Sequence, residues 1–476
     1  MKKKITFYLF AFLILSRAMA QGGFFQVEFP ASTCVNCHTV PLGTGDRVAQ
    51  CATAPGGIHN IFCSWPIGSM YRRIELPILA NPYGAIGYTV NDMKAVGNKL
   101  FMCGTMQTPL GSGSAFPDGY AEEGFMAILN LDDVFDAYGT SPRFRYSKIG
   151  GTADLRRLAV SVNGSDTAIF AIGKNSDGSP VFVAVNDYNA WNCNVQTFDS
   201  PTETFTDIVV CGKFVAVASR FANENYTFGL RLAGLQMLAS REGFADLAQV
   251  HKFITLGMHT AGFSDHPTRH ADDATIRIAV QADDELTVAY EGYNAILQQD
   301  QFIPAMAKVM ALFRIDAGSV YNPIMTDARD FDVPYHNGEL FEDMQAVPAT
   351  GEYALLHRDR ASVLGGGGVA VFSWNTTSLQ VISRPASSME SFGVSGTRLW
   401  YGGNRQESGV LYCGVHPLGL PDESQCLQSL TRNCHPLDEP CSKITLETIS
   451  SLDDVIFGWD RVNLEPMQVQ KDIVCE

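Results

Sequence analysis

The sequence predicts an all-β fold. Two observations indicate this class: short apolar runs recur in pairs along the middle of the chain, and turn-forming residues are frequent, with 43 glycines and 22 prolines. The 476 residues suffice for one large all-β domain or for two to three average domains. Because 46% of the residues are hydrophobic and 18% are charged, the chain can form a large packed core, which excludes global disorder.

The first twenty residues predict a signal peptide (residues 1–20). Three lysines at positions 2–4 precede an apolar run from Ile5 to Leu15, which is shorter than the roughly 20 residues that span a bilayer. Ala18 and Ala20 fit the small-residue pattern of a cleavage site. We therefore expect cleavage near Ala20, a mature chain without a membrane span, and a secreted, periplasmic or cell-surface location.

The twelve cysteines agree with export, because disulfides form outside the cytoplasm. Two groups lie in loop-like sequence, one in a Cys-rich N-terminal segment (residues 21–85) and one at the end of the remaining chain (residues 86–476). We expect two disulfides in each group, with the pairing open. The candidates are Cys34, Cys37, Cys51, Cys63, Cys426, Cys434, Cys441 and Cys475.

The N-terminal group contains the spacing Cys34-x-x-Cys37-His38, which matches the attachment signature of c-type haem. A haem domain needs helices around the macrocycle, whereas residues 21–85 are rich in Gly, Pro and Thr and show no helical apolar period. Cys51 and Cys63 offer thiol partners nearby. We therefore expect disulfides here, with haem and zinc as alternatives, and no cofactor for the protein as a whole.

The strands are predicted in six successive units, each a hairpin followed by a third strand. The units share one design, in which an acidic or polar start, as at Asp92, Asp207 and Ser391, leads into an apolar run and then a turn at a Gly or polar residue. The paired runs lie at 92–104 and 124–131, 158–173 and 180–185, 207–218 and 227–232, 274–290 and 307–315, 344–356 and 368–374, and 391–403 and 409–415.

This arrangement resembles the β-propeller superfamily, and in particular exported bacterial propellers, over most of residues 85–460. The unit starts recur at roughly 50–70 residues, which suits propeller blades with loop insertions. The resemblance implies six or seven blades, with seven favoured if runs near residues 71–79 and 444–459 complete the ring, so that the N-terminal segment partly joins it. The alternative fold is a pair of β-sandwiches.

A second candidate site is a His- and Asp-rich stretch before the run at 274–290. Four of the ten histidines fall within twenty residues there. Imidazole and carboxylate groups could bind a divalent metal or act as an acid–base pair, and a solvated polar loop is the alternative. The candidate residues are His259, Asp265, His266, His270 and Asp272.

The function predicted from the sequence is binding. The net charge of −16 argues against nucleic acid as a partner, because phosphate contacts need clustered Lys and Arg. The chain contains neither Gly-x-Ser-x-Gly nor His-Glu-x-x-His. We expect an extracellular glycan or protein ligand at a loop-lined mouth of the ring. The alternative is a hydrolase or lyase with a His/Asp site, because propeller enzymes assemble such sites from several blades.

Overall fold

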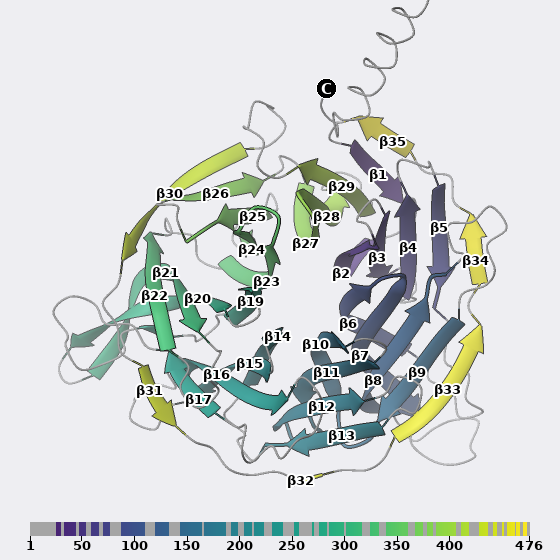
Figure 1. The fold of residues 1–476 in the computed structure, drawn as a ribbon, viewed down its shortest axis with the longest axis horizontal. Helices are drawn as coiled ribbons and strands as arrows, with labels where there is room; N and C mark the ends of the chain where they lie inside the picture. The colour runs from purple at the N-terminus through teal and green to yellow at the C-terminus, as the bar shows by residue number, and fades with distance from the viewer. Residues whose placement is uncertain are drawn as a thin grey trace, which may run out of the picture.

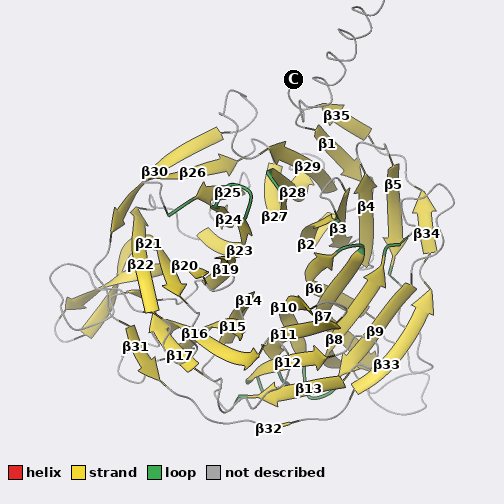
Figure 2. Ribbon diagram, in the orientation of Figure 1, coloured by secondary structure: helices red, strands yellow, loops and turns green. Residues whose placement is uncertain are grey.

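The structure is a computed structural model of the chain. It describes residues 25–29, 33–43, 47–53, 59–65, 70–76, 87–109, 120–132, 143–163, 166–186, 192–198, 204–211, 214–222, 231–240, 252–256, 269–270, 276–282, 285–298, 301–316, 324–332, 339–359, 367–374, 378–383, 387–405, 411–417, 428–436, 441–444, 450–451, 455–461, 463–466 and 470–473. The predicted all-β class is confirmed, because these residues form strands and turns and no helix (Figure 2). Within these ranges no helix is long and apolar enough to cross a membrane.

The described strands form units of antiparallel sheet that stand around a central axis, as in a β-propeller (Figure 1). The first blade contains β2 (Thr33–Leu42), β3 (Arg47–Thr53), β4 (His59–Trp65) and β5 (Met70–Glu75). The second contains β6 (Gly87–Val96), β7 (Lys99–Pro109), β8 (Tyr120–Asn130) and β9 (Arg143–Ile149). The third contains β10 (Asp154–Asn163), β11 (Asp166–Lys174), β12 (Pro180–Asn186) and β13 (Asn192–Thr197).

The remaining blades repeat this plan. The fourth contains β14 (Thr204–Cys211), β15 (Phe214–Ala222), β16 (Arg231–Ser240) and β17 (Lys252–Leu256). The fifth contains β18 (Arg269–His270), β19 (Ile276–Ala282), β20 (Glu285–Gln298), β21 (Gln301–Asp316) and β22 (Ile324–Asp332). The sixth contains β23 (Glu339–Val347), β24 (Glu352–Asp359), β25 (Gly367–Phe372) and β26 (Ser378–Ser383).

The seventh blade joins the two ends of the ring. Its strands β27 (Ser387–Ser395), β28 (Arg398–Arg405) and β29 (Leu411–Pro417) are completed by β1 (Phe25–Phe29), which pairs with β29. The innermost strands β2, β6, β10, β14, β19, β23 and β27 each contact the next around the axis, and β27 contacts β2. A strand from the N-terminal segment therefore closes the ring.

The C-terminal strands form an outer belt, which we define as β30 to β35. It consists of β30 (Gln428–Pro436), β31 (Cys441–Ile444), β32 (Ser450–Ser451), β33 (Val455–Arg461), β34 (Asn463–Pro466) and β35 (Gln470–Ile473). β30 pairs with the outer strands of the sixth and fifth blades, and each later strand pairs with one further blade, back to β1 of the seventh. The belt thus runs around the circumference against the order of the blades (Figure 1).

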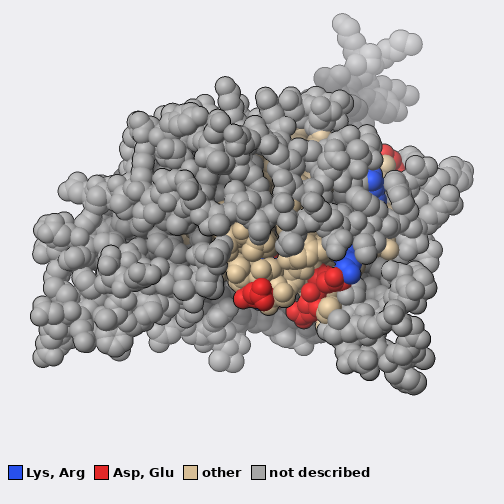
Figure 3. All heavy atoms as spheres, turned by 90° about the horizontal axis from the view of Figure 1, so that it is seen from below, with Lys and Arg blue, Asp and Glu red and all other residues tan. Residues whose placement is uncertain are grey.

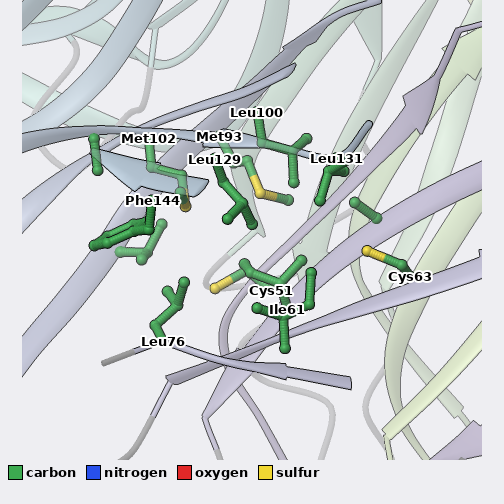
Figure 4. Packing of buried hydrophobic residues seen from close by; sticks show 14 of the residues in the cluster. Cys51, Ile61, Cys63, Leu76, Met93, Leu100, Met102, Leu129, Leu131 and Phe144 are labelled. Atoms are coloured by element: carbon green, nitrogen blue, oxygen red, sulfur yellow. The ribbon is translucent and has the colours of Figure 1, made fainter. Parts of the chain in front are cut away.

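The hydrophobic core lies between neighbouring blades. One cluster joins the first two blades and contains Cys51, Ile61 and Cys63 on one side and Met93 and Phe144 on the other (Figure 4). Similar clusters join the second to the third, the third to the fourth, the fifth to the sixth and the sixth to the seventh blade. A small sheet with two apolar faces is buried only when it stacks on both neighbours, which explains the apolar runs in the sequence.

Two of the cysteines expected to form disulfides, Cys51 and Cys63, do not form them. Cys51 and Cys63 are buried thiols. They lie on the paired strands β3 and β4, where their small apolar side chains fill the cluster between the first two blades. Burial raises the pKa of the Cys51 thiol to about 12 and raises that of Cys63 as well, so both stay protonated.

Candidate functional site

The innermost strands carry one polar or charged residue each at an equivalent position beside the central channel. In five of these strands the pairing register shifts immediately before that residue, which marks a β-bulge, and in β2 it shifts between Thr33 and His38. We call the set the channel ring. Its members are His38, Asp92, Arg157, Asp207, Arg277, Asp343 and Ser391, in the order of the blades.

Glycines opposite these bulges allow the inner strand to bend. Gly104 on β7 pairs with Val90, and Gly173 on β11 pairs with Leu155, each at the residue before the shift. A Cβ atom at Gly104 would collide with the carbonyl oxygen of Thr89, and one at Gly173 with that of Asp154. The second strand therefore needs glycine where the inner strand turns its next side chain toward the channel.

Charges alternate around the channel ring. Asp92, Arg157, Asp207, Arg277 and Asp343 follow one another on consecutive blades. Each residue of one sign therefore has neighbours of the opposite sign, which lowers the cost of burying charge in the middle of the molecule. On the exposed surface both signs are also present, and Figure 3 shows acidic and basic side chains next to each other on one side.

Two of the three aspartates in the channel ring, Asp92 and Asp207, bind backbone amides of two blades. Asp92 accepts hydrogen bonds from the N–H of Met93 at 2.8 Å and from that of Leu158, on the third blade, at 2.9 Å. Asp207 repeats this with Ile208 at 3.0 Å and with Ile278, on the fifth blade, at 2.9 Å. Both oxygens of each carboxylate are therefore engaged by backbone donors.

The arginines bind backbone carbonyls in the same region. Arg277 donates from Nε to the carbonyl oxygen of Glu342 at 2.7 Å and from Nη1 to that of Thr206 at 2.8 Å. Arg157 donates from Nη2 to the same Glu342 oxygen, across the channel. Because the innermost strands have no sheet neighbour on the channel side, these side chains supply partners that the edges otherwise lack.

Uncharged side chains link the remaining blades. Gln345 on the sixth blade accepts the N–H of Val394 at 3.1 Å and donates to the carbonyl oxygen of Phe392 at 3.1 Å, both on the seventh blade. Ser391 on the seventh blade and Thr39 on the first share a hydroxyl hydrogen bond of 2.6 Å. The contacts on the channel side therefore continue across the point where the ring closes.

The pKa values reflect this mixture of burial and charge. Burial lowers the pKa of His38 to about 4, against the opposing charge of Asp92, so the imidazole is neutral at pH 7. Burial also lowers the pKa of Lys94, but the charges of Asp92 and Asp343 outweigh it and hold that pKa above its usual value. Burial raises the pKa of Asp207 despite Arg277 and Arg157.

A cavity of about 570 Å³ occupies the channel at this level. Its walls come from the innermost strands of all seven blades and include His38, Lys94, Arg157 and Val209. This volume lies in the range of ordinary small-ligand pockets. Among the described residues, no group of three or more His, Cys, Asp or Glu side chains is arranged to hold a metal ion.

The structure describes only some of the candidate site residues and cysteines that were predicted from the sequence. His270 lies in β18 and pairs with Tyr293, but its side chain and the residues His259, Asp265, His266 and Asp272 fall outside the described part. Cys37 is disulfide-bonded, while the side chain of Cys34 is not described. Cys434 and Cys441 lie in the outer belt with undescribed side chains, and Cys426 and Cys475 fall outside the described ranges. Those disulfides remain predictions.

Sequence reasoning missed the channel ring. Its signal was present in the acidic or polar residue that begins several of the predicted units, namely Asp92, Asp207 and Ser391. Such a residue is usual at a strand start, so the pattern alone does not separate a turn from a channel. Only the closure of the ring brings these positions together.

No protein-family model matches the chain, and no curated protein matches it. Among solved structures it is similar to a GH32 β-fructofuranosidase of Bombyx mori in complex with sucrose, with 9% identity, a TM-score of 0.30, and coverage of 87% of this chain and 93% of that one. It is also similar to a Trypanosoma rangeli sialidase in complex with difluorosialic acid, with 8% identity, a TM-score of 0.33, and coverage of 81% of this chain and 54% of that one. For the β-propeller domain of the Trilobed protease of Pyrococcus furiosus, the identity is 7%, the TM-score is 0.28, and the match covers 75% of this chain and 97% of that one. The β-propeller fold itself rests on the ring of sheets described above.

Proposed function

We propose that the protein is an exported β-propeller that binds a polar, hydroxyl-rich ligand, such as a glycan, in the cavity of the central channel. One observation carries the proposal: Asp92 and Asp207 are bound by backbone amides, while Lys94 lines the cavity with an ammonium group that makes no hydrogen bond among the described groups. A cavity of this size accepts a sugar ring.

The use of the carboxylates favours binding over acid–base catalysis. A catalytic carboxyl group must exchange a proton or form a bond with the substrate. Asp92 and Asp207 are buried, and each has both oxygens bonded to backbone N–H groups. Removing either carboxylate from these bonds would leave buried amides without a partner, which costs about 1–3 kcal/mol each.

A steric block of the cavity tests the proposal. Val209 lines the cavity on β14, whereas Val162 on β10 is exposed and lies outside it. We expect Val209→Trp to abolish binding of an oligosaccharide found by screening, because the larger side chain fills the pocket. The matched Val162→Trp variant should bind as the wild type does. Equal binding by both folded variants, measured by calorimetry, would place the ligand elsewhere.

Export is part of the proposal and has its own measurement. If the signal peptide is cleaved, the intact mass of the protein recovered from the medium or periplasm corresponds to a chain beginning at Gln21. Protein retained in the cytoplasm at full length would contradict export.

A hydrolase or lyase is the second candidate function, and His38 favours it. Its imidazole lines the cavity and is neutral at pH 7, which is the form that can accept a proton, although a pKa of about 4 makes it a weak base. Turnover of a glycan that is lost in His38→Ala would support this function. The sequence candidates His266 and His270 are tested separately, since a metal-dependent site there predicts loss of bound metal in the double alanine variant.

A further inference from the structure

Three nitrogen atoms surround one carboxylate oxygen in the channel without hydrogen-bonding to it. Lys94 Nζ lies 3.8 Å from Asp92 Oδ1, and His38 Nδ1 and Arg157 Nη1 each lie 3.9 Å from the same atom. These distances allow electrostatic attraction but exceed a hydrogen bond. Asp92 therefore gathers three nitrogen groups at one place while the backbone amides of Met93 and Leu158 hold the carboxylate itself.

The four side chains differ in their access to the cavity. The side chain of Asp92 is 3% exposed, those of Arg157 and His38 are 14% and 15% exposed, and that of Lys94 is 35% exposed. The carboxylate thus lies beneath the nitrogen groups. A ligand entering the cavity meets the ammonium group of Lys94 before it meets Asp92.

Lys94 keeps its hydrogen-bonding capacity for a ligand. Among the described groups its ammonium has an ion pair with Asp92 but makes no hydrogen bond. A ligand that covers it removes water, and this costs free energy unless the ligand supplies an acceptor oxygen. An ionised acceptor gives the strongest bond to an ammonium group, about twice that of a neutral one.

The surrounding charges limit what the ligand can carry. The acidic residues of the cavity lining outnumber Lys94 and Arg157, so a multiply charged anion would be repelled there. These acidic residues are Asp92, Asp207, Glu342, Asp343 and Glu390. One additional negative charge placed at the exposed ammonium is separated from Asp92 by the nitrogen groups themselves.

We infer that the cavity recognises a sugar bearing a carboxylate, with the carboxylate bound by Lys94. The inference rests on the proposed binding function and names the ligand class of that same cavity. Lys94 is its specificity-determining residue, since among the cations that line the cavity it is the most exposed and can distinguish the acidic sugar from its neutral counterpart.

The test compares glucuronate with glucose, which share the ring and differ in the carboxylate. Binding of each is measured by calorimetry or ligand-observed NMR to the full mature chain and to Lys94→Met, which keeps the length of the side chain and removes its charge. The matched control is Lys174→Met, because Lys174 lies on β11 outside the cavity lining. Acetate serves as a third probe, for the carboxylate alone.

We expect wild type and Lys174→Met to bind glucuronate at least tenfold more tightly than glucose or acetate, as a charge-assisted hydrogen bond provides. Lys94→Met should lose this preference and keep its weak affinity for glucose. Equal binding of glucose and glucuronate by the wild type would overturn the carboxylate assignment and leave the proposed function intact. Binding of neither sugar would overturn both, and acetate binding as tight as glucuronate would replace the sugar with a simple carboxylate.

Discussion

The channel ring shows how single side chains can complete the hydrogen bonding of an open strand edge. In an ordinary sheet the N–H of Leu158 or Ile278 would bond to a neighbouring strand, but both face the channel. Asp92 and Asp207 take the place of that strand. Each carboxylate also joins two blades, so the loss of one should weaken both the local pairing and the contact between blades.

Asp92→Asn tests this role. The substitution leaves one acceptor oxygen for two backbone donors and removes the charge that Lys94 and Arg157 face. We expect the free energy of unfolding in urea to fall by about 3–5 kcal/mol, as when one partner of a buried ion pair is removed. The control is Asp177→Asn in an exposed turn, which should change it by about 0.5 kcal/mol or less. Similar small effects for both would contradict the role of Asp92.

His38 makes a pH-dependent contribution with a definite sign. Its pKa is about 4 in the folded protein and 6.5 ordinarily, so between these values the unfolded chain binds more protons. Stability due to His38 is therefore complete above about pH 6.5 and falls by roughly 1.4 kcal/mol for each pH unit down to about pH 4. His38→Gln should show a flatter decline in urea unfolding over this window. Parallel curves for the two proteins would refute the assignment.

At the scale of elements, the blades of the ring are complete without the strands of the outer belt. Without the belt every blade still has its inner strands and a fourth strand, since β1 completes the seventh. The belt only adds a further strand at each outer edge. Its structural role is to cover edges that would otherwise be open to pairing with other chains.

Removal of residues 418–476 should therefore leave the ring folded. We expect the truncated protein to keep its far-UV β-sheet spectrum, to melt at a lower temperature, and to associate through its exposed outer edges in size-exclusion chromatography. Deletion of β1 provides the comparison, because it opens the seventh blade and should destabilise the ring more. A truncated chain without β-sheet signal would show that the belt is needed for the ring itself.

The sequence predicted the strands well where an apolar run is bounded by turn residues. The runs at 158–173 and 207–218 correspond to the hairpins β10–β11 and β14–β15. The run expected at 227–232 overlaps β16, which extends beyond it to Ser240 through residues without strict alternation. Local pattern thus indicates a strand more reliably than its ends.

Long-range pairing could not be predicted from the sequence. The runs near residues 71–79 and 444–459 were expected to complete one blade together, but β5 belongs to the first blade while β31, β32 and β33 pair with the fourth, third and second. The sequence of a strand in the outer belt does not indicate which blade that strand pairs with. The channel ring could not be predicted for the same reason, because His38 and Arg157 come close to Asp92 only when the ring closes.

The whole molecule is therefore a ring whose channel-facing edges are closed by charged side chains. The most direct measurement is hydrogen exchange of the backbone amides of Leu158 and Ile278 in the wild type and in Asp92→Asn. The structure predicts slow exchange of both amides in the wild type, and faster exchange of Leu158 alone in the variant, because Ile278 is held by Asp207. Rapid exchange of both amides in the wild type would contradict the closure of the inner edges by the channel ring.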